Sequence, residues 1–294
     1  MSDPKPTLGF IGLGLMGTPM AVKLREAGYP LVVWGRTPAK LAPALALGAR
    51  EAASPRAVAA ESEAILLCVT DTQAVETLVF GEDGIAAGGS AGKLLIDHSS
   101  IRPDATRSMA ERLASACGMD WIDAPVSGGP VGVESKTLVV MAGGEAAPFS
   151  RAEAILAAYA GRVTRMGPVG AGQTTKLINQ ALCGVGFAVM AEIAALARDA
   201  GIDAEQIPPA LAGGRADSRL LQEYLPRMAR RDFALTARID IILKDLGMVA
   251  DFAHETGSAL PITSMAAELH RLATENGLGA EDNAALVRLY DRPE

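Results

Sequence analysis

The chain has 294 residues, of which 49% are apolar and 21% charged, so it is long enough for two domains and too apolar for a disordered protein. Its net charge of −7 argues against nucleic acid or an anionic membrane surface as a partner. The polar start and the short apolar run behind it do not resemble a signal peptide or an anchor, so we expect a cytoplasmic protein.

The cysteines and histidines give no sign of a metal or a disulfide framework. The three cysteines lack CxxC spacing and lie in apolar surroundings, which favours reduced packing residues; they are Cys68, Cys117 and Cys183. The three histidines lack metal-ligand spacing; they are His98, His254 and His270. We therefore predict no metal.

The first motif is a glycine-rich turn between an apolar strand and a helix. A strand from residue 8 leads into G-x-G-x-x-G at Gly12, Gly14 and Gly17, and residues 18–27 favour a helix. Gly12 permits the tight turn, Gly14 lets a pyrophosphate approach the backbone, and Gly17 lets the helix pack on the strand. A second strand at 31–34 completes a βαβ unit, which predicts a dinucleotide site that includes Leu13 and Met16.

The residues after the second strand indicate which dinucleotide binds. An acidic side chain there would accept the ribose hydroxyl of NAD, but this chain has Arg36 and Thr37, with Lys40 one turn later. These side chains favour the 2′-phosphate of NADP. We therefore expect NADP(H) to be preferred and NAD(H) to be a second cofactor.

Apolar runs of strand length continue to about residue 166. Those at 64–69 and 93–96 flank a helical stretch at 72–80, as in a parallel sheet, and end in the polar segments Thr70-Asp71 and His98-Ser99-Ser100. Further strands are expected at 121–126, 138–142 and 162–166, with a helix at 147–159. The turn Ser127-Gly128-Gly129-Pro130 is either an anion-binding nest of backbone amides or an ordinary surface turn.

A long helix is expected in the stretch 167–201, after the glycines at 167, 170 and 172 break the chain. Its first turns carry Lys176, Asn179, Gln180 and Cys183 on one face, and the apolar run at 181–191 is too short to span a bilayer before Glu192. Taken alone, Lys176 is either a solvated lysine or part of a reactive face.

The rest of the chain favours helices, at 204–211, 218–230, 235–254, 263–275 and 281–290. Asp240 and Lys244 form an acid-before-base pair that by itself indicates only helix stabilisation.

These elements predict an α/β fold, with a Rossmann-type dinucleotide-binding domain at 1–166 and an all-α substrate or oligomerisation domain at 167–294, joined by the long helix. The length and apolar character of that helix predict an oligomer, a homodimer or homotetramer.

Four motifs in order resemble the β-hydroxyacid dehydrogenase family, which includes 3-hydroxyisobutyrate dehydrogenases, tartronate semialdehyde (2-hydroxy-3-oxopropionate) reductases and threonate dehydrogenases. They are GFIGLGLMG at 9–17, DAPVSGG at 123–129, GxGQTTKLIN at 170–179 and KDL at 244–246. The first is common to many folds, whereas the lysine motif following DAPVSGG is specific.

The resemblance implies an oxidoreductase acting on a small anionic substrate, with Lys176 as catalytic acid/base and Asn179 beside it. It further implies that Ser127, Gly128 and Gly129 hold the substrate carboxylate. The nicotinamide side would be lined by Val69, Thr70, Ser100 and Lys244.

Three positions depart from the family pattern and bear on the substrate. Gln180 replaces the second amide of the usual Asn-Asn pair and is a candidate substrate contact, Lys136 stands where glycine is usual, and Ala237 replaces a frequent aromatic. Ala237 should enlarge the pocket, into which Lys136, Arg215, Arg219 or Arg238 could reach. We therefore expect a threonate or tartronate semialdehyde to be favoured over 3-hydroxyisobutyrate.

Three other functions share this architecture. An imine reductase usually has Asp or Tyr in place of Lys176, and a non-catalytic NADPH-binding scaffold lacks the lysine; a 6-phosphogluconate dehydrogenase would retain it but is generally longer in its helical half. The presence of Lys176 favours the hydroxyacid dehydrogenase.

Overall fold

The structure is a computed structural model that describes residues 4–292. Its chain divides into two compact units between Lys176 and Leu177, inside one long helix. The domain boundary expected after residue 166 remains a prediction.

The first unit is built on a nine-stranded sheet of order β3-β2-β1-β4-β5-β6-β8-β7, with β9 pairing β8. The pairs from β3 to β6 are parallel, as expected, whereas β8 is antiparallel to β6 and β7 and parallel to β9. The strands are β1 (Leu8–Ile11), β2 (Leu31–Trp34), β3 (Arg50–Glu51), β4 (Ala64–Leu67), β5 (Leu94–Asp97), β6 (Asp120–Asp123), β7 (Val126–Ser127), β8 (Leu138–Gly143) and β9 (Ala160–Gly167).

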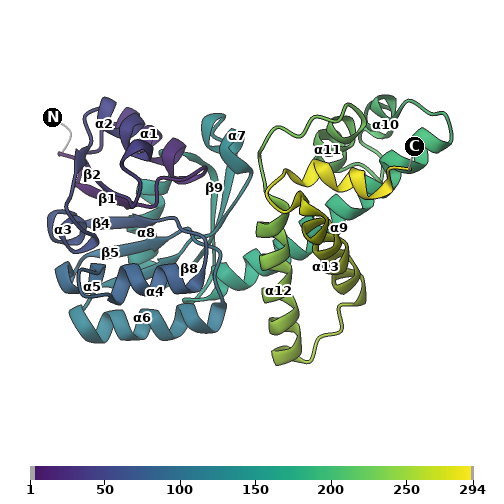
Figure 1. The fold of residues 1–294 in the computed structure, drawn as a ribbon. Helices are drawn as coiled ribbons and strands as arrows, with labels where there is room; N and C mark the ends of the chain where they lie inside the picture. Colours follow the sequence, from purple (N-terminus) through teal and green to yellow (C-terminus); the bar gives the residue numbers. More distant parts are fainter. Residues whose placement is uncertain (1–3, 293–294) are drawn as a thin grey trace. The chain divides into compact units, whose positions relative to one another are not determined.

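Helices cover both faces of this sheet (Figure 1). One face packs against α1 (Gly17–Glu26), α2 (Ala42–Ala46), α7 (Gly129–Glu134) and α8 (Ala146–Leu156), with η1 (Pro38–Lys40) leading into α2. The other packs against α3 (Pro55–Glu61), α4 (Thr72–Phe80), α5 (Ile85–Gly88) and α6 (Pro103–Cys117). The expected Rossmann-type architecture is therefore confirmed.

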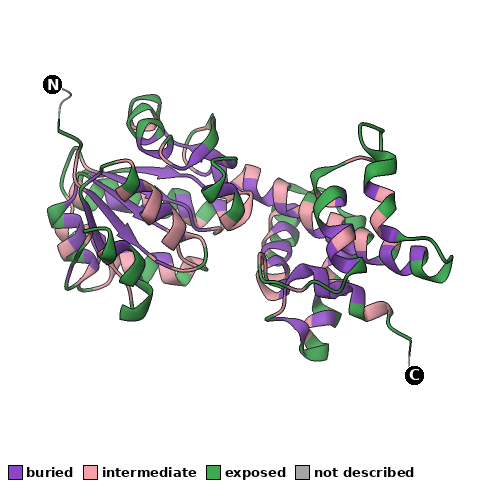
Figure 2. Cartoon of the chain, turned by 90° about the horizontal axis from the view of Figure 1, so that it is seen from above, coloured by how far each residue is buried: buried purple, intermediate pink, exposed green. Residues whose placement is uncertain are grey.

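The apolar runs form strands because neighbouring side chains face two different cores. Leu66 belongs to the core beneath α1 and α8, whereas Ile65 and Leu67 belong to the core beneath α3, α4 and α6. A strand buried on both faces has no polar alternation, and Figure 2 shows the central strands almost uniformly buried.

The second unit is helical. It contains most of α9 (Ala171–Asp199), then η2 (Ala204–Gln206), α10 (Ile207–Leu211), α11 (Arg219–Ala229), α12 (Ile239–Thr256), α13 (Pro261–Ala273), η3 (Thr274–Leu278) and η4 (Asn283–Tyr290). Among the described helices, α9 alone is long and apolar enough to cross a membrane by length and composition. Its residues Phe187, Ala191 and Ala194 lie in the core of this unit, as in a core helix of a soluble protein.

Several expected elements differ in detail. The strand expected at 121–126 breaks after Asp123, because Pro125 has no N–H for the ladder, and the chain resumes as β7 against β8. The helix expected from 235 begins at Ile239, since the N–H groups of Thr236 and Ala237 bond to the Asp282 side chain instead. The last expected helix is a 3-10 helix, η4, and α6 was not predicted.

Candidate active site

The glycine turn after β1 has the geometry that its sequence predicts. Gly12 has a φ of 98°, and a Cβ on Gly12 or Gly17 would overlap backbone carbonyl oxygens, of Cys68 and Gly12 respectively. A Cβ on Gly14 would meet no described atom within 4 Å, so packing does not explain that glycine. The first turn of α1 also has no capping side chain and no acidic residue, so no carboxylate there would repel an anionic ligand at the start of the helix.

The other residues of the first motif, Leu13 and Met16, have packing roles, and a hollow begins beside Gly14. Leu13 is buried in the core and Met16 packs against it from the start of α1. A hollow of about 590 Å³ begins at Gly14 and is lined by α1 and by Pro130 and Glu134 of α7. The glycine turn and the helix that follows the SGG segment are therefore neighbours.

The side chains expected to select the cofactor lie just beyond β2. Arg36, Thr37 and Lys40 are all exposed. The Thr37 side chain does not cap η1, although the residue stands at its N-cap. Within residues 4–292, neither Arg36 nor Lys40 has an ion-pair partner, so both cations are available to an anionic group.

The ends of β4 and β5 lie next to one another, because Leu67 and Asp97 are register partners. The Val69 N–H donates to the Ser99 Oγ at 3.0 Å, which joins the two loops that carry Thr70 and Ser100. β1 pairs with β4 on its other side, so these loops follow the glycine turn along one edge of the sheet. The structure thus brings together the first-unit residues assigned to the cofactor at the carboxyl ends of β1, β4 and β5.

His98 and Ser99, which the sequence placed among the polar residues of this edge, are buried beneath it. The His98 Nδ1 lies 2.6 Å from the Ala124 carbonyl, which can only accept, so the ring donates there and accepts from the Tyr159 hydroxyl at Nε2, 2.7 Å away. Burial lowers the pKa of His98 to about 4, which keeps the ring neutral. His98 therefore supports the edge from within.

The SGG segment lies at the start of α7. Ser127 pairs with β8, and Gly128 and Gly129 have φ values of 125° and 62°, which favour glycine. All three residues are half-buried. Lys136, in the turn before β8, has a φ of 56°, so the glycine usual in the family suits this conformation better than lysine does.

Lys176 lies beside this segment. Its side chain is buried, and its Nζ donates to the carbonyl oxygen of Val126 at 2.8 Å. Val126 directly precedes Ser127, so the lysine that the sequence singled out and the proposed carboxylate site are brought together within the first unit. This juxtaposition makes Lys176 more than a solvated surface lysine.

In the second unit, Asn179, Gln180 and Lys244 are linked through Asp245, a buried carboxylate that sequence reasoning did not assign. The Gln180 Nε2 donates to Asp245 Oδ2 at 2.5 Å, and Lys244 Nζ lies 3.0 Å from Asp245 Oδ1. The Asn179 Nδ2 donates to Gln180 Oε1 at 2.8 Å. Because a carboxylate only accepts, it orients the Gln180 amide, which in turn orients Asn179. The KDL motif was the available signal.

Two of the residues expected to reach into the substrate pocket form local ion pairs. Arg238 pairs with Asp240, and Arg219 lies 4.0 Å from Glu223. Arg215 is exposed.

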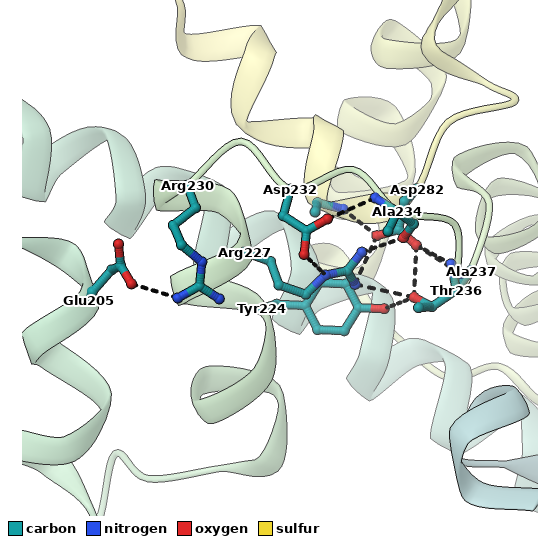
Figure 3. Close-up of polar contacts among 10 residues, drawn as sticks. Glu205, Tyr224, Arg227, Arg230, Asp232, Ala234, Thr236, Ala237 and Asp282 are labelled. Atoms are coloured by element: carbon teal, nitrogen blue, oxygen red, sulfur yellow. Dashed lines mark hydrogen bonds and ion pairs between the residues drawn. The ribbon is translucent and has the colours of Figure 1, made fainter. Parts of the chain in front are cut away.

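Ala237 is held by a buried network around Asp282 (Figure 3). Asp282 Oδ2 accepts from the N–H groups of Thr236 and Ala237 at 2.7 and 2.9 Å, and its Oδ1 lies 3.2 Å from the guanidinium of Arg227. The segment that carries Ala237 is therefore fixed by backbone bonds that do not depend on the side chain at 237.

No cluster of three or more His, Cys, Asp or Glu side chains in the described part of the chain could hold a metal. The three cysteines are half-buried thiols.

Comparison with known proteins matches two family descriptions over nearly the whole chain. Residues 7–167 match the NAD binding domain of 6-phosphogluconate dehydrogenase, and residues 170–290 match the NAD-binding domain of NADP-dependent 3-hydroxyisobutyrate dehydrogenase.

Named relatives align from end to end. The 2-hydroxy-3-oxopropionate reductase of Escherichia coli K12 is 38% identical, covering 97% of each chain, and the L-threonate dehydrogenase of Cupriavidus necator is 34% identical, covering 96% of this chain and 95% of the relative. The crystal structure of 3-hydroxyisobutyrate dehydrogenase from Salmonella typhimurium has a TM-score of 0.87 at 33% identity, covering 96% of this chain and 99% of the other.

The fold, the glycine turn and the matched families agree on an NAD(P)-dependent oxidoreductase of hydroxy acids. The chain belongs to the β-hydroxyacid dehydrogenase family.

Proposed function

We propose that this protein transfers a hydride between NADP(H) and a small β-hydroxy acid or its semialdehyde, with Lys176 as the general acid/base. The observation that carries the proposal is the buried Lys176 Nζ, 2.8 Å from the carbonyl of Val126 and hence next to the SGG segment. In a β-hydroxy acid, the carbon that bears the hydroxyl is bonded to the carbon that bears the carboxylate. It fits a site in which the carboxylate is held at Ser127, Gly128 and Gly129 and the hydroxyl meets the lysine.

The chemistry asks little of the protein beyond alignment and one proton. NADP(H), when bound, supplies or accepts the hydride. In reduction, the Lys176 ammonium hydrogen-bonds the substrate carbonyl oxygen and protonates it as negative charge develops. In oxidation, the neutral amine accepts the hydroxyl proton. Asn179, one turn further along α9, orients the same oxygen, and Gln180 and Asp245 fix its amide.

Removal of the Lys176 amine tests this assignment. We expect Lys176→Ala and the longer Lys176→Met to lower turnover by about 10² or more, the scale of a lost general acid/base, while NADPH binding measured by nucleotide fluorescence stays nearly unchanged. Thr175→Ala, next to it on α9, is the matched control and should keep native turnover. Substantial remaining turnover in both Lys176 variants would sink the assignment.

The substrate is proposed to be a hydroxylated C4 acid such as a threonate, or tartronate semialdehyde. The named relatives act on such acids, and Ala237 leaves space where an aromatic is frequent. The methyl group of 3-hydroxyisobutyrate would leave polar groups of such a pocket unpaired, which lowers its kcat/KM. Steady-state assays of the three acids measure this ranking.

Two results of that panel would contradict the proposal. If 3-hydroxyisobutyrate has the highest kcat/KM, the pocket is not enlarged and polar as proposed. If primary alcohols without a carboxylate are as active as the hydroxy acids, the SGG segment does not bind the substrate carboxylate.

We also propose that the protein is a homodimer or homotetramer in the cytoplasm. The support for association is a stripe of exposed apolar side chains on α9, which we call the α9 stripe: Leu182, Val189 and Leu196, seven residues apart.

A further inference from the structure

Two motif residues with no assigned role, Asp123 and Gln173, hold the first turn of α9. Asp123 is fully buried at the end of β6, and its two carboxylate oxygens accept from the N–H groups of Gly170 and Gln173, each at 2.8 Å. The first N–H groups of a helix have no partner within the helix, so this carboxylate satisfies donors at the start of α9. Burial raises the pKa of Asp123, and these N–H groups oppose that rise.

The glycines around Asp123 permit this close approach. A Cβ on Gly172 would lie 2.8 Å from Asp123 Oδ2 and 2.5 Å from the carbonyl of Met141, and a Cβ on Gly143 would overlap Asp123 Oδ1. Glycines from two different elements are thus needed for one carboxylate to reach the helix. This accounts for the second glycine of the GxGQTTK motif without any ligand.

The Gln173 side chain holds the same turn to the loop after β5. It is buried, its Nε2 donates to the Ser99 carbonyl at 2.7 Å, and its Oε1 accepts from the Ile101 N–H at 3.2 Å. Those two residues flank Ser100, the proposed nicotinamide contact. One amide therefore fixes both sides of that residue.

Lys176 stands one turn beyond Gln173, and its Nζ bonds to Val126, on the segment that starts at Asp123. The β6–β7 segment is thus joined to α9 twice, at Asp123 and at Val126. A shift of the first turn of α9 would move the Lys176 amine relative to both Ser127 and Ser100.

We propose that Asp123 and Gln173 are positioning residues, which set Lys176 against the SGG segment and against the Ser100 loop respectively. The inference rests on the proposed function of Lys176. Neither side chain touches the reacting atoms. Their contribution is to the placement of the lysine, where an error of about 1 Å costs about 10² in rate.

The substitution Asp123→Asn tests the first half. Asparagine has one side-chain acceptor, so its NH2 would face the N–H of either Gly170 or Gln173, and the turn must move. We expect kcat to fall about 10- to 100-fold with little change in the KM for NADPH. We also expect a larger primary isotope effect on kcat with deuterated cofactor, because hydride transfer becomes slower relative to product release.

Gln173→Met tests the second half, since it keeps the length of the side chain and removes both bonds to the Ser100 loop. We expect a lower kcat together with a raised KM for NADPH. Because the two variants differ in the cofactor KM, the pair distinguishes a displaced lysine from a displaced nicotinamide loop. If Asp123→Asn does not fold, Gln173→Met alone still decides whether the α9 turn controls turnover.

Ser54→Ala is the matched control for a purely structural role. Ser54 caps α3 in the same unit by accepting from the Ala57 N–H at 3.2 Å, so its loss should lower the Tm and leave kcat unchanged. Native kcat per folded enzyme in Asp123→Asn and Gln173→Met, with only the Tm lowered, would overturn the inference. If both variants keep the native kcat while Lys176→Ala is inactive, the proposed function stands and the positioning roles are wrong. If the native enzyme itself is inactive on the hydroxy acids, the proposed function is wrong.

Discussion

Arg36 is the side chain on which the cofactor preference depends. It is exposed just past β2, within residues 4–292 it has no ion-pair partner, and Lys40 follows it. A guanidinium that is not engaged by the protein can bind a 2′-phosphate with two charge-assisted hydrogen bonds. An aspartate at the same place would repel that phosphate and accept from the ribose hydroxyl of NAD.

We therefore predict that native enzyme has a higher kcat/KM with NADPH than with NADH and that Arg36→Asp reverses the order. Loss of charge-assisted bonds worth about 1.5–3 kcal/mol corresponds to roughly 10- to 100-fold in that ratio. Arg56→Asp, an equal charge change on the exposed face of α3, is the control and should leave the ratio as it is. Equal efficiency of the native enzyme with both cofactors would show that Arg36 does not bind the phosphate.

At the residue scale, sequence reasoning found the residues that motifs mark and missed their partners. Lys176 was singled out by its motif, although its local pattern alone left it either a solvated lysine or part of a reactive face. Asp245 was not singled out, because its bond to Gln180 joins residues far apart in the chain. Asp123 and Gln173 lay inside recognised motifs without a role for the same reason: each acts on a distant backbone segment.

At the scale of elements, the strands buried on both faces and their parallel pairing were predictable, whereas the antiparallel pairing of β8 was not. The run at 31–34 and the helix at 72–80 match β2 and α4, because a continuous apolar run marks a buried strand and the stretch between two such runs marks a helix of the alternating fold. The antiparallel insertion of β8 between β6 and β7 depends on long-range pairing. The helix α6 was missed because its polar face masks a narrow apolar stripe, of which Met109 and Leu113 are buried.

The end of β5 carries two buried groups whose effects on stability oppose each other. Burial lowers the pKa of His98 from 6.5 to about 4, so the unfolded chain binds a proton between these values that the folded chain does not, and stability falls as pH drops through that window. Burial raises the pKa of Asp97 from 3.8 to about 7, so the folded chain holds the extra proton there and stability rises as pH drops. The two trends cancel in large part in the native protein.

Asp97→Asn should expose the His98 trend, because asparagine does not titrate. We expect the free energy of unfolding of this variant, relative to native, to decrease as pH falls from 7 to about 4.5, by at most about 1.4 kcal/mol per pH unit. Urea unfolding followed by tryptophan emission measures it, since Trp34 and Trp121 both lie in the first unit. Asp120→Asn, an exposed carboxyl on β6, is the control. Parallel pH profiles for native and Asp97→Asn would contradict the argument.

At the scale of the whole molecule, the change from alternating strands and helices to helices alone predicted the two-part organisation. The structure places the change of unit inside α9, after Lys176, because the first turn of that helix is bonded to β6 and to the β5 loop, while Phe187 and Ala191 pack in the helical core. The sequence pattern of α9 indicates one continuous helix and does not tell that its two ends pack in different cores.

The α9 stripe leads to a prediction about assembly. Leu182, Val189 and Leu196 are 70%, 40% and 63% exposed, and their spacing of seven keeps them on one side of the helix. Three large aliphatic side chains left in water on one helix face favour burial against a second copy. We expect two or four subunits by light scattering after size exclusion, and dissociation toward the monomer in Leu182→Glu and Leu196→Glu, because each carboxylate would be desolvated in an apolar interface at a cost of several kcal/mol. Ile202→Glu, at a side chain 57% exposed beyond the end of α9, is the matched control and should keep the native mass. A monomeric native protein, or stripe variants with the native subunit number, would show that this face is not what joins the copies.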